Sequence, residues 1–437
     1  MPAVIIVQPV TAGLLLIDAA RRHGLHPIVL CHQRPDQMVP AAVVAEGTAT
    51  LHRVETNDRD AVLAMVKHLA DSQDVVGVLP GFEYYVPVAA EAAASLGLPG
   101  LDPAVAECVR DKRLMRQALA GAGLAVPRFR VASAPAEAQA AAEAIGYPVV
   151  IKPPRAAGSV HVTRVAGPEE LQAAYHALCA ETELDLGDQP DQQVLIESYL
   201  DGPEYSAEGY VAGGVATVVS ITEKLLSAPP IFLELGHTVP ADLPAPRLRE
   251  LADWAATVAE ALQLDNSLFH LEFRLCPDGP YVIELGARLP GDEIAELVRL
   301  STGISLADVF VELAAGTEAA GTEAAGTEAA GGTAGGGTAG GGRAGDARGL
   351  AAEFGQVAGI RFFTDPGLAE VRRVPSPERL LAAAPQVRHA ELTAAVGDRP
   401  NDHRDFRMRL GWVVLAAADR ASLDAGWATV SARSLFG

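Results

Sequence analysis

The sequence has little positive charge. Its 437 residues include 34 lysines and arginines against 55 aspartates and glutamates, which gives a formal net charge of −21. Nucleic-acid binding rests on basic side chains that neutralise phosphates, so this composition argues against a nucleic-acid partner. No apolar run approaches the roughly 20 residues that a membrane-spanning helix needs. The start, residues 1–13, lacks the basic segment of a signal peptide and is typical of a buried strand. We therefore expect a cytoplasmic protein without a membrane partner.

Cysteine is also scarce. The chain has four cysteines, with no CxxC pair and no other metal-ligand spacing. Scattered thiols of this kind normally remain reduced in a cytoplasm. We expect neither disulfides nor a catalytic thiol from these residues, which are Cys31, Cys108, Cys179 and Cys276.

Lysine is the rarest charged residue. Only four of the 34 basic residues are lysines. Where almost every cation is arginine, a retained lysine is a candidate for a position that needs a compact ammonium rather than a planar guanidinium. The alternative is that the lysines are chance survivors of a biased composition. They are Lys67, Lys112, Lys152 and Lys224.

The first hundred residues alternate between short apolar runs and helical segments. Residues 3–7 (AVIIV) and 74–82 (DVVGVLPGF) have the composition of buried strands, and a helical pattern follows each. This alternation predicts an open parallel sheet with helices on both faces, whose strand ends form a cleft. Gly13 is not part of a GxGxxG motif, so a dinucleotide site is not supported. We assign residues 1–102 to this N-terminal α/β domain.

The middle of the chain is richer in strands. Residues 103–123 predict one helix, with Pro103 near its start and glycines at its end. Strands are expected in YPVVIKPP, HVTRVA and QVLIESYL, and in the alternating segment 205–226. Further helices are expected near 168–181, over 247–263 and over 291–300.

Residues 316–345 are low-complexity sequence that begins with three copies of the unit GTEAA. Glycine and alanine bury too little surface to offset the entropy of ordering, so we expect a flexible loop without a functional role. The last ninety residues or so return to a folded composition, with strand candidates in VAGIRFF and RLGWVVLAA.

Residues 271–288, LEFRLCPDGPYVIELGAR, predict a β-hairpin about a Pro-Asp-Gly turn. Folding this hairpin about Asp278 places Glu272 directly opposite Glu284. Facing residues lie roughly 5 Å apart, and like charges there destabilise a sheet. A divalent cation between the carboxylates removes that repulsion, and Mg²⁺ binds carboxylate together with phosphate oxygens. We therefore predict a site for one or two Mg²⁺ ions that carry a nucleotide; the alternative is a solvated polar face on an ordinary hairpin.

Two further segments suit a nucleotide. The strand YPVVIK delivers Lys152 beside a small-residue turn that contains Ser159, and an ammonium, a hydroxyl and loop N–H groups can together hold a triphosphate. VLIESYLDGPEYS places Glu197 and Glu204 on either side of a Gly-Pro bend, where backbone groups can meet an adenine and a carboxylate can meet ribose hydroxyls. Each segment could also have a purely structural role. Lys112 lies in a predicted helix, and the alternative is that it is an ordinary surface cation.

In order and spacing over most of the chain, these residues resemble the ATP-grasp superfamily. The resemblance implies an α/β ATP-grasp fold with ATP as cofactor: the N-terminal open parallel domain, a linker helix with a small β-rich lid lobe (103–198), and a larger lobe with a C-terminal subdomain (199–437). The nucleotide contacts that it implies are Lys112 and Lys152 as the two nucleotide lysines, Glu197 as a hinge or amino-group contact, Ser198 and Leu200 as backbone partners of adenine, and Glu204 as the ribose ligand.

The resemblance extends to the hairpin. Glu272 and Glu284 match the two metal carboxylates, and Arg288 matches the arginine that contacts the transferred phosphate and acyl group. The family often has an Asn two residues after the second carboxylate as a further ligand, whereas this chain has Gly286, so a second ion would have fewer protein ligands. This variant, with GFEYYVPVAA, TEKLL, LELGHTVPADLP and RLGWVV, is similar to amino-acid ligases of the carboxylate–amine type.

This finer resemblance implies an ADP-forming ligase. ATP would phosphorylate a carboxylate, and an amine would displace phosphate from the acyl phosphate to form an amide or peptide bond; the expected substrates are small molecules, in particular amino acids. His237 or Glu83 would face the amine or the carboxylate, Lys224 would reach phosphate, and Arg409 would contact the first substrate. Superfamily members often form dimers, so a homodimer is a possible assembly.

Two other functions remain open. An ATP-grasp carboxylase would use bicarbonate as the acceptor, although no biotin-carrier motif surrounds any of the four lysines. A non-catalytic ATP-binding regulator would follow if Gly286 impairs the metal site.

Overall fold

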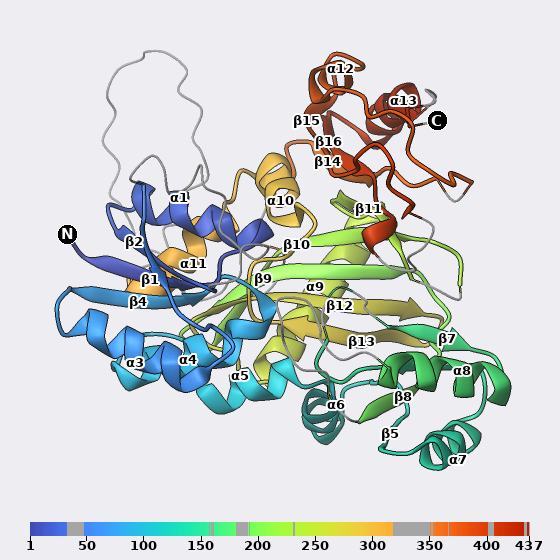
Figure 1. Cartoon of the computed structure of the whole chain (residues 1–437), viewed down its shortest axis with the longest axis horizontal. Coiled ribbons are helices and arrows are strands. Elements are labelled where there is room, and N and C mark those ends of the chain that lie inside the picture. Colours follow the sequence, from blue (N-terminus) through green and yellow to red (C-terminus); the bar gives the residue numbers. More distant parts are fainter. Residues whose placement is uncertain are drawn as a thin grey trace.

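The computed structural model describes residues 1–32, 48–156, 158, 161–180, 191, 193–229, 232–317, 350, 353–365, 367–400, 406–431 and 435–436. Ser159 and all but the first two residues of the predicted loop 316–345 lie outside the described residues. The described strands form three sheets, arranged as Figure 1 shows.

The N-terminal sheet is parallel, with strand order β3-β2-β1-β4. Every residue of its central strand, β1, is buried, which explains the uninterrupted apolar run. Helix α1 (Leu15–Arg22) shares a core with Val4 and Ile6, while α3 (Arg59–Ala70) and α4 (Val86–Ser95) share a core on the opposite face. The predicted parallel sheet with helices on both faces is confirmed. Its strands are β1 (Ala3–Val7), β2 (His26–Cys31), β3 (Thr50–Arg53) and β4 (Val75–Pro80).

The loops that follow β1 and β4 pack backbone to backbone. A Cβ atom on Gly13 would lie 2.0 Å from the carbonyl oxygen of Gly81, so only glycine permits this approach. The contact holds the loop after β4, in which the short 3-10 helix η3 (Glu83–Tyr85) carries Glu83 toward the large sheet.

The segment predicted as one helix over 103–123 is two helices, so that prediction is wrong. Helix α5 (Pro103–Arg110) ends at Asp111, whose backbone is extended, and α6 (Lys112–Gly121) begins directly after it. The side chain of Asp111 accepts a hydrogen bond from the backbone N–H of Arg113 and so caps α6. The break makes Lys112 the first residue of a helix.

The small sheet is antiparallel, with strand order β5-β8-β6-β7. Helices α7 (Pro135–Ile145) and α8 (Pro168–Cys179) share one apolar core with it. In Figure 1 this unit lies beside the edge of the large sheet that carries β13. Its strands are β5 (Phe129–Ala132), β6 (Val149–Lys152), β7 (Thr163–Val165) and β8 (Val194–Ser198).

The large sheet has eight strands in the order β13-β12-β9-β10-β11-β14-β16-β15. Helix α9 (Ala245–Ala261) packs against one face. On the other side, α10 (Ile294–Thr302) and α11 (Leu306–Ala315) lie in the core that also contains residues of β1 and α1, and they join the large sheet to the N-terminal sheet. The strands are β9 (Glu204–Ala212), β10 (Val215–Leu226), β11 (Glu234–Val239), β12 (Ser267–Cys276), β13 (Gly279–Gly286), β14 (Val357–Phe362), β15 (Val387–Leu392) and β16 (Gly411–Ala417).

Two short helices complete the C-terminal part, α12 (Pro377–Leu381) and α13 (Arg420–Ser431). Within the described ranges, no helix is both long enough and apolar enough to span a membrane.

Candidate active site

The predicted facing carboxylates are present. Glu272 on β12 and Glu284 on β13 are direct cross-strand partners. The predicted register about Asp278 is wrong next to the turn, where Cys276 pairs with Gly279 and Phe273 pairs with Val282. Ile283 is then an extra, bulged residue, and this bulge restores the predicted pairing at Glu272. The two carboxylates therefore project from the same face of the large sheet.

Two lysine ammonium groups offset the repulsion between these carboxylates. Lys112 Nζ lies 2.7 Å from Glu284 Oε1, and Lys224 Nζ lies 2.7 Å from Glu272 Oε1. Burial acts to raise the pKa of Glu272, but the neighbouring cations, above all Lys224, hold that pKa well below its usual value. Glu272 is therefore ionised, and facing carboxylate oxygens are the type of ligand that a divalent cation prefers.

Lys224 lies among three carboxylates. Its ammonium is 2.7 Å from Glu272, 2.8 Å from Glu234 and 3.3 Å from Glu204. Burial alone would lower the pKa of Lys224, but these three carboxylates raise it well above its ordinary value. The side chain is thus a permanent cation within an acidic cluster.

Lys152 belongs to a buried ion-pair triad. Glu197 Oε2 lies 2.6 Å from Lys152 Nζ, and Glu197 Oε1 lies 2.8 Å from Arg116 Nε. Burial acts to raise the pKa of Glu197, but Arg116 and Lys152 hold it below its usual value. Burial lowers the pKa of the Lys152 ammonium, and Glu197 only partly offsets this effect. Glu197 therefore fixes the position of Lys152 at the end of β6.

One cavity between the small sheet and the large sheet is lined by most of these groups, although not by Lys224 or Arg116. It opens to solvent. At one end the rings of Tyr199 and Phe232 stack 6.3 Å apart, and the guanidinium of Arg274 lies against both rings. The backbone oxygen of Leu200 accepts a hydrogen bond from Arg274. The sequence-predicted residues that line this cavity are Glu83, Lys112, Lys152, Glu197, Ser198, Leu200, Glu204, Glu272, Glu284 and Arg288.

Gly286 stands in place of the asparagine that the resemblance implies, and the packing around it gives a structural reason. A Cβ atom on Gly286 would lie 2.6 Å from Glu83 Oε2, so the buried carboxylate of Glu83 occupies the space that a side chain would need. Arg288 Nε binds the same oxygen at 2.6 Å. Burial acts to raise the pKa of Glu83, but Arg288, Arg110 and Lys112 hold it below its ordinary value. An acidic group from the loop after β4 thus occupies the space beside Gly286, where the resemblance implies an asparagine.

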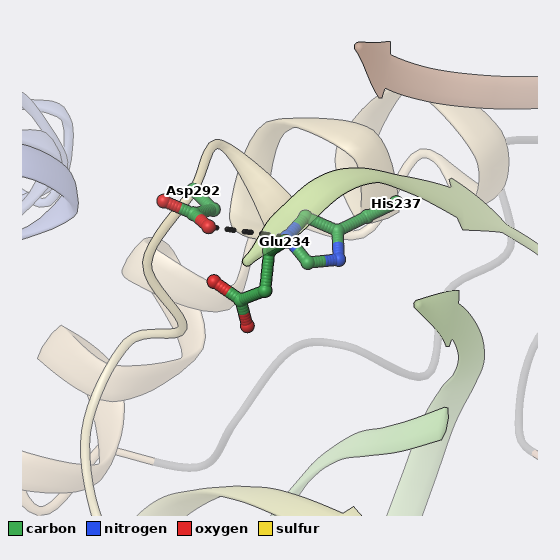
Figure 2. A group of neighbouring side chains, drawn as sticks. All are labelled: Glu234, His237 and Asp292. Atoms are coloured by element: carbon green, nitrogen blue, oxygen red, sulfur yellow. Dashed lines mark hydrogen bonds and ion pairs between the residues drawn. The ribbon is translucent and has the colours of Figure 1, made fainter. Parts of the chain in front are cut away.

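His237 and Arg409 lie beside this cavity rather than in its lining. Figure 2 shows His237 with Glu234 and Asp292, whose ligand-type atoms all lie within 4.8 Å of one another. The guanidinium of Arg409 already binds this group, at 2.9 Å from both oxygens of Asp292 and 3.0 Å from Glu234. Arg409 therefore supplies the positive charge beside these acidic side chains, and the geometry does not require a metal ion.

Arg409 and Asp292 also line a second, partly open cavity between the C-terminal strands and the loop after β1. Its walls include Ile360, Phe362 and Trp412. Because Glu234 lines the first cavity and binds Arg409, a short polar chain connects the two cavities.

Sequence reasoning missed several residues of the site. Glu208 and His270 lie on the same face as Glu272, and Arg116 on α6 completes the Lys152 triad. Alternating polar residues in EYSAEG and HLEFR were a usable signal, since side chains two apart on a strand share a face. The other missed residues are Glu234, Arg274 and Asp292.

The chain matches known proteins over both its N-terminal and central regions. Models described as the ATP-grasp N-terminal domain and the ATP-grasp domain match residues 17–100 and 145–296. The uncharacterized protein y4rH of Sinorhizobium fredii (strain NBRC 101917 / NGR234) is 31% identical over 423 residues, 95% of this chain and 78% of y4rH.

Two named proteins are more distant. Alanine–anticapsin ligase of Bacillus subtilis (strain 168) is 24% identical over 280 residues, and the match spans 60% of this chain but only 58% of that ligase. The crystal structure of L-amino acid ligase from Bacillus licheniformis has a TM-score of 0.75 at 22% identity, covering 99% of this chain and 97% of that one, a likeness of fold. On the family models, the y4rH match and the shared fold, this chain belongs to the ATP-grasp family.

Proposed function

We propose that this chain is an ADP-forming carboxylate–amine ligase that makes an amide or peptide bond, with amino acids as substrates. The observation that carries the proposal is the pair of facing carboxylates, Glu272 and Glu284, in one cavity with Lys112 and Lys152. Two carboxylates and two ammonium groups are the set that Mg²⁺ and a triphosphate need. The ligase names of distant relatives such as alanine–anticapsin ligase support the same class.

The nucleotide would lie across the first cavity. Glu272 and Glu284 would hold one or two Mg²⁺ ions, which when bound neutralise phosphate charge and orient the triphosphate. Lys112 and Lys152 would contact phosphate oxygens. The strip from Glu197 to Leu200 would meet the adenine. Glu204 would meet the ribose.

The chemistry would proceed in two transfers. The substrate carboxylate attacks the γ-phosphorus of ATP, which gives an acyl phosphate and ADP. The amine then attacks the acyl carbon, loses a proton and expels inorganic phosphate. Arg288, which lies in the cavity beside Glu83, is placed to stabilise the charge that develops on the transferred phosphoryl and acyl oxygens. The small sheet and its helices would close over the site and exclude water from the acyl phosphate.

The substrates would lie toward the second cavity. Glu83 and His237 would face the amine or carboxylate groups, and Arg409 would contact the first substrate. The apolar walls at Ile360, Phe362 and Trp412 leave room for a side chain. Lys224 contacts Glu272 and Glu234, so it would set the charge between the nucleotide and the substrates.

Purified protein incubated with ATP, Mg²⁺ and pairs of amino acids tests the proposal. Phosphate and ADP release that needs two amino acids, with an amide product in the mass spectrum, is the expected result. Release that follows bicarbonate supports a carboxylase instead, and ATP binding without turnover supports a regulator. We also propose that the protein acts in the cytoplasm, and that the domain assignment 1–102, 103–198 and 199–437 reflects its three sheets; a homodimer stays a prediction.

A further inference from the structure

Glu208 is a buried carboxylate that the nucleotide chemistry does not use. It lies on β9 with 0% of its surface exposed. A charge in such a place is costly unless donors surround it. Burial acts to raise the pKa of Glu208, but His270 and neighbouring hydroxyls hold it below its usual value. The hydroxyl donors are Ser206 at 2.6 Å, Ser220 at 2.8 Å and Thr222 at 2.5 Å.

His270 connects Glu208 to the predicted metal ligand. Its Nδ1 lies 3.0 Å from Glu208 Oε1, and its Nε2 lies 3.2 Å from Glu272 Oε1. A neutral imidazole donates from only one nitrogen, whereas the imidazolium donates from both. Both ring nitrogens face carboxylate oxygens, which accept hydrogen bonds but do not donate them. The ring is therefore held at both ends by ionised partners.

The hydrogen bonds to Glu272 reach only one of its two carboxylate oxygens. Both Lys224 Nζ and His270 Nε2 reach Oε1. Among the described residues, no hydrogen bond or ion pair to Oε2 accompanies them. Two donors from different strands, β10 and β12, thus fix one oxygen of a carboxylate that also lines the first cavity.

We propose that Glu208 and His270 are positioning residues for Glu272, which fix its Oε1 so that Oε2 alone is presented to Mg²⁺. This inference rests on the proposed function, because Glu272 is a metal ligand only there. Glu284 differs, since its contact is to Lys112 on α6 rather than to a residue of its own sheet. Glu272 is then the preformed ligand of the pair.

Binding of Mn²⁺ in the presence of a non-hydrolysable ATP analogue tests the inference without turnover. Free Mn²⁺ is measured by electron paramagnetic resonance for the wild type, His270→Gln, Glu208→Gln and the surface control His389→Gln, whose side chain is 56% exposed. We expect about tenfold weaker Mn²⁺ binding in the first two variants and no change in the control. Turnover by these two variants should recover at saturating Mg²⁺.

The direction of the change in Mn²⁺ affinity distinguishes a positioning role of His270 from a purely electrostatic one. Removing the His270 cation would by electrostatics alone tighten Mn²⁺ binding, so unchanged or tighter binding overturns the inference. If Glu208→Gln does not fold, His270→Gln carries the test, since Glu208 keeps its three hydroxyl donors. Glu272→Gln separates the two levels: if it leaves Mn²⁺ binding intact, the metal assignment of the proposed function fails; if it abolishes binding while His270→Gln does not weaken it, only the positioning inference fails.

Discussion

Replacing Glu197 with glutamine leaves two buried cations without their anion. Arg116 is 0% exposed and Lys152 is 4% exposed, and Glu197 binds them at 2.8 and 2.6 Å. Removing one member of a buried ion pair costs about 3–5 kcal/mol. Glutamine keeps the shape and can still accept a hydrogen bond, and Arg116 also donates to the backbone oxygen of Ile283. We therefore expect a loss of about 3 kcal/mol in the free energy of unfolding at pH 7.

The loss should shrink as the pH rises. Burial already lowers the pKa of Lys152 in the folded protein, and without Glu197 that pKa falls further. An unfolded lysine titrates near pH 10.4, so between the lowered folded pKa and that value the unfolded chain binds more protons than the folded one. Stability therefore increases with pH across this window, because the buried ammonium can become neutral.

Urea unfolding at pH 7 and pH 9.5 measures both effects. The control is Glu250→Gln, whose carboxylate side chain is 65% exposed and pairs with Arg247 on the surface of α9. We expect it to change stability by less than about 1 kcal/mol at either pH. A loss in Glu197→Gln no larger than in the control, or one that grows with pH, would refute the reasoning.

Three further changes give distinct results. Glu284→Gln should abolish phosphate release while circular dichroism stays native; undiminished activity at ordinary Mg²⁺ would refute the metal role. Gly286→Asn should destabilise by about 1–3 kcal/mol in urea, because its Cβ meets Glu83 Oε2; in a Glu83→Ala background the same substitution should cost much less, and an equal cost in both backgrounds would contradict the steric account. Deletion of 316–345 should leave activity nearly unchanged, whereas a collapse in folding yield would show that the loop prediction is wrong.

Local patterns predicted much of the fold. Buried parallel strands such as β1 follow from continuous apolar runs. The hairpin was predicted correctly, but the turn register alone would place Glu272 opposite Ile283, and it is a bulge, which the sequence did not reveal, that pairs Glu272 with Glu284. The prediction of a single helix over 103–123 was wrong because the side chain of Asp111 caps a new helix and so competes with continuation of the first one.

The scarcity of lysine was informative. Lys112, Lys152 and Lys224 are all buried in or beside the first cavity, while Lys67 lies exposed on α3. Composition alone could not predict which carboxylates pair with these lysines, because each partner comes from a distant part of the chain.

The order of the strands in the large sheet brings together the residues around Glu208 and His270. EYSAEG and HLEFR show that Glu208 and His270 share faces with neighbouring polar residues, and Ser206 lies on the same strand as Glu208. Only the order β12-β9-β10, however, brings Ser220, Thr222 and the imidazole onto Glu208. Likewise, nothing local links Gly286 to Glu83, since the contact joins the N-terminal domain to the hairpin. Such long-range complementarity arises from packing and has no sequence period.

The transfer of oxygen from substrate to phosphate tests the central claim most directly. An amino acid labelled with ¹⁸O in its carboxylate is incubated with ATP, Mg²⁺, a second amino acid and the wild-type protein, and the released phosphate is analysed by mass spectrometry. The account predicts ADP and one ¹⁸O in each phosphate released per amide formed, because the carboxylate oxygen becomes the bridge of the acyl phosphate. Unlabelled phosphate with an amide product, or label in AMP, would contradict it.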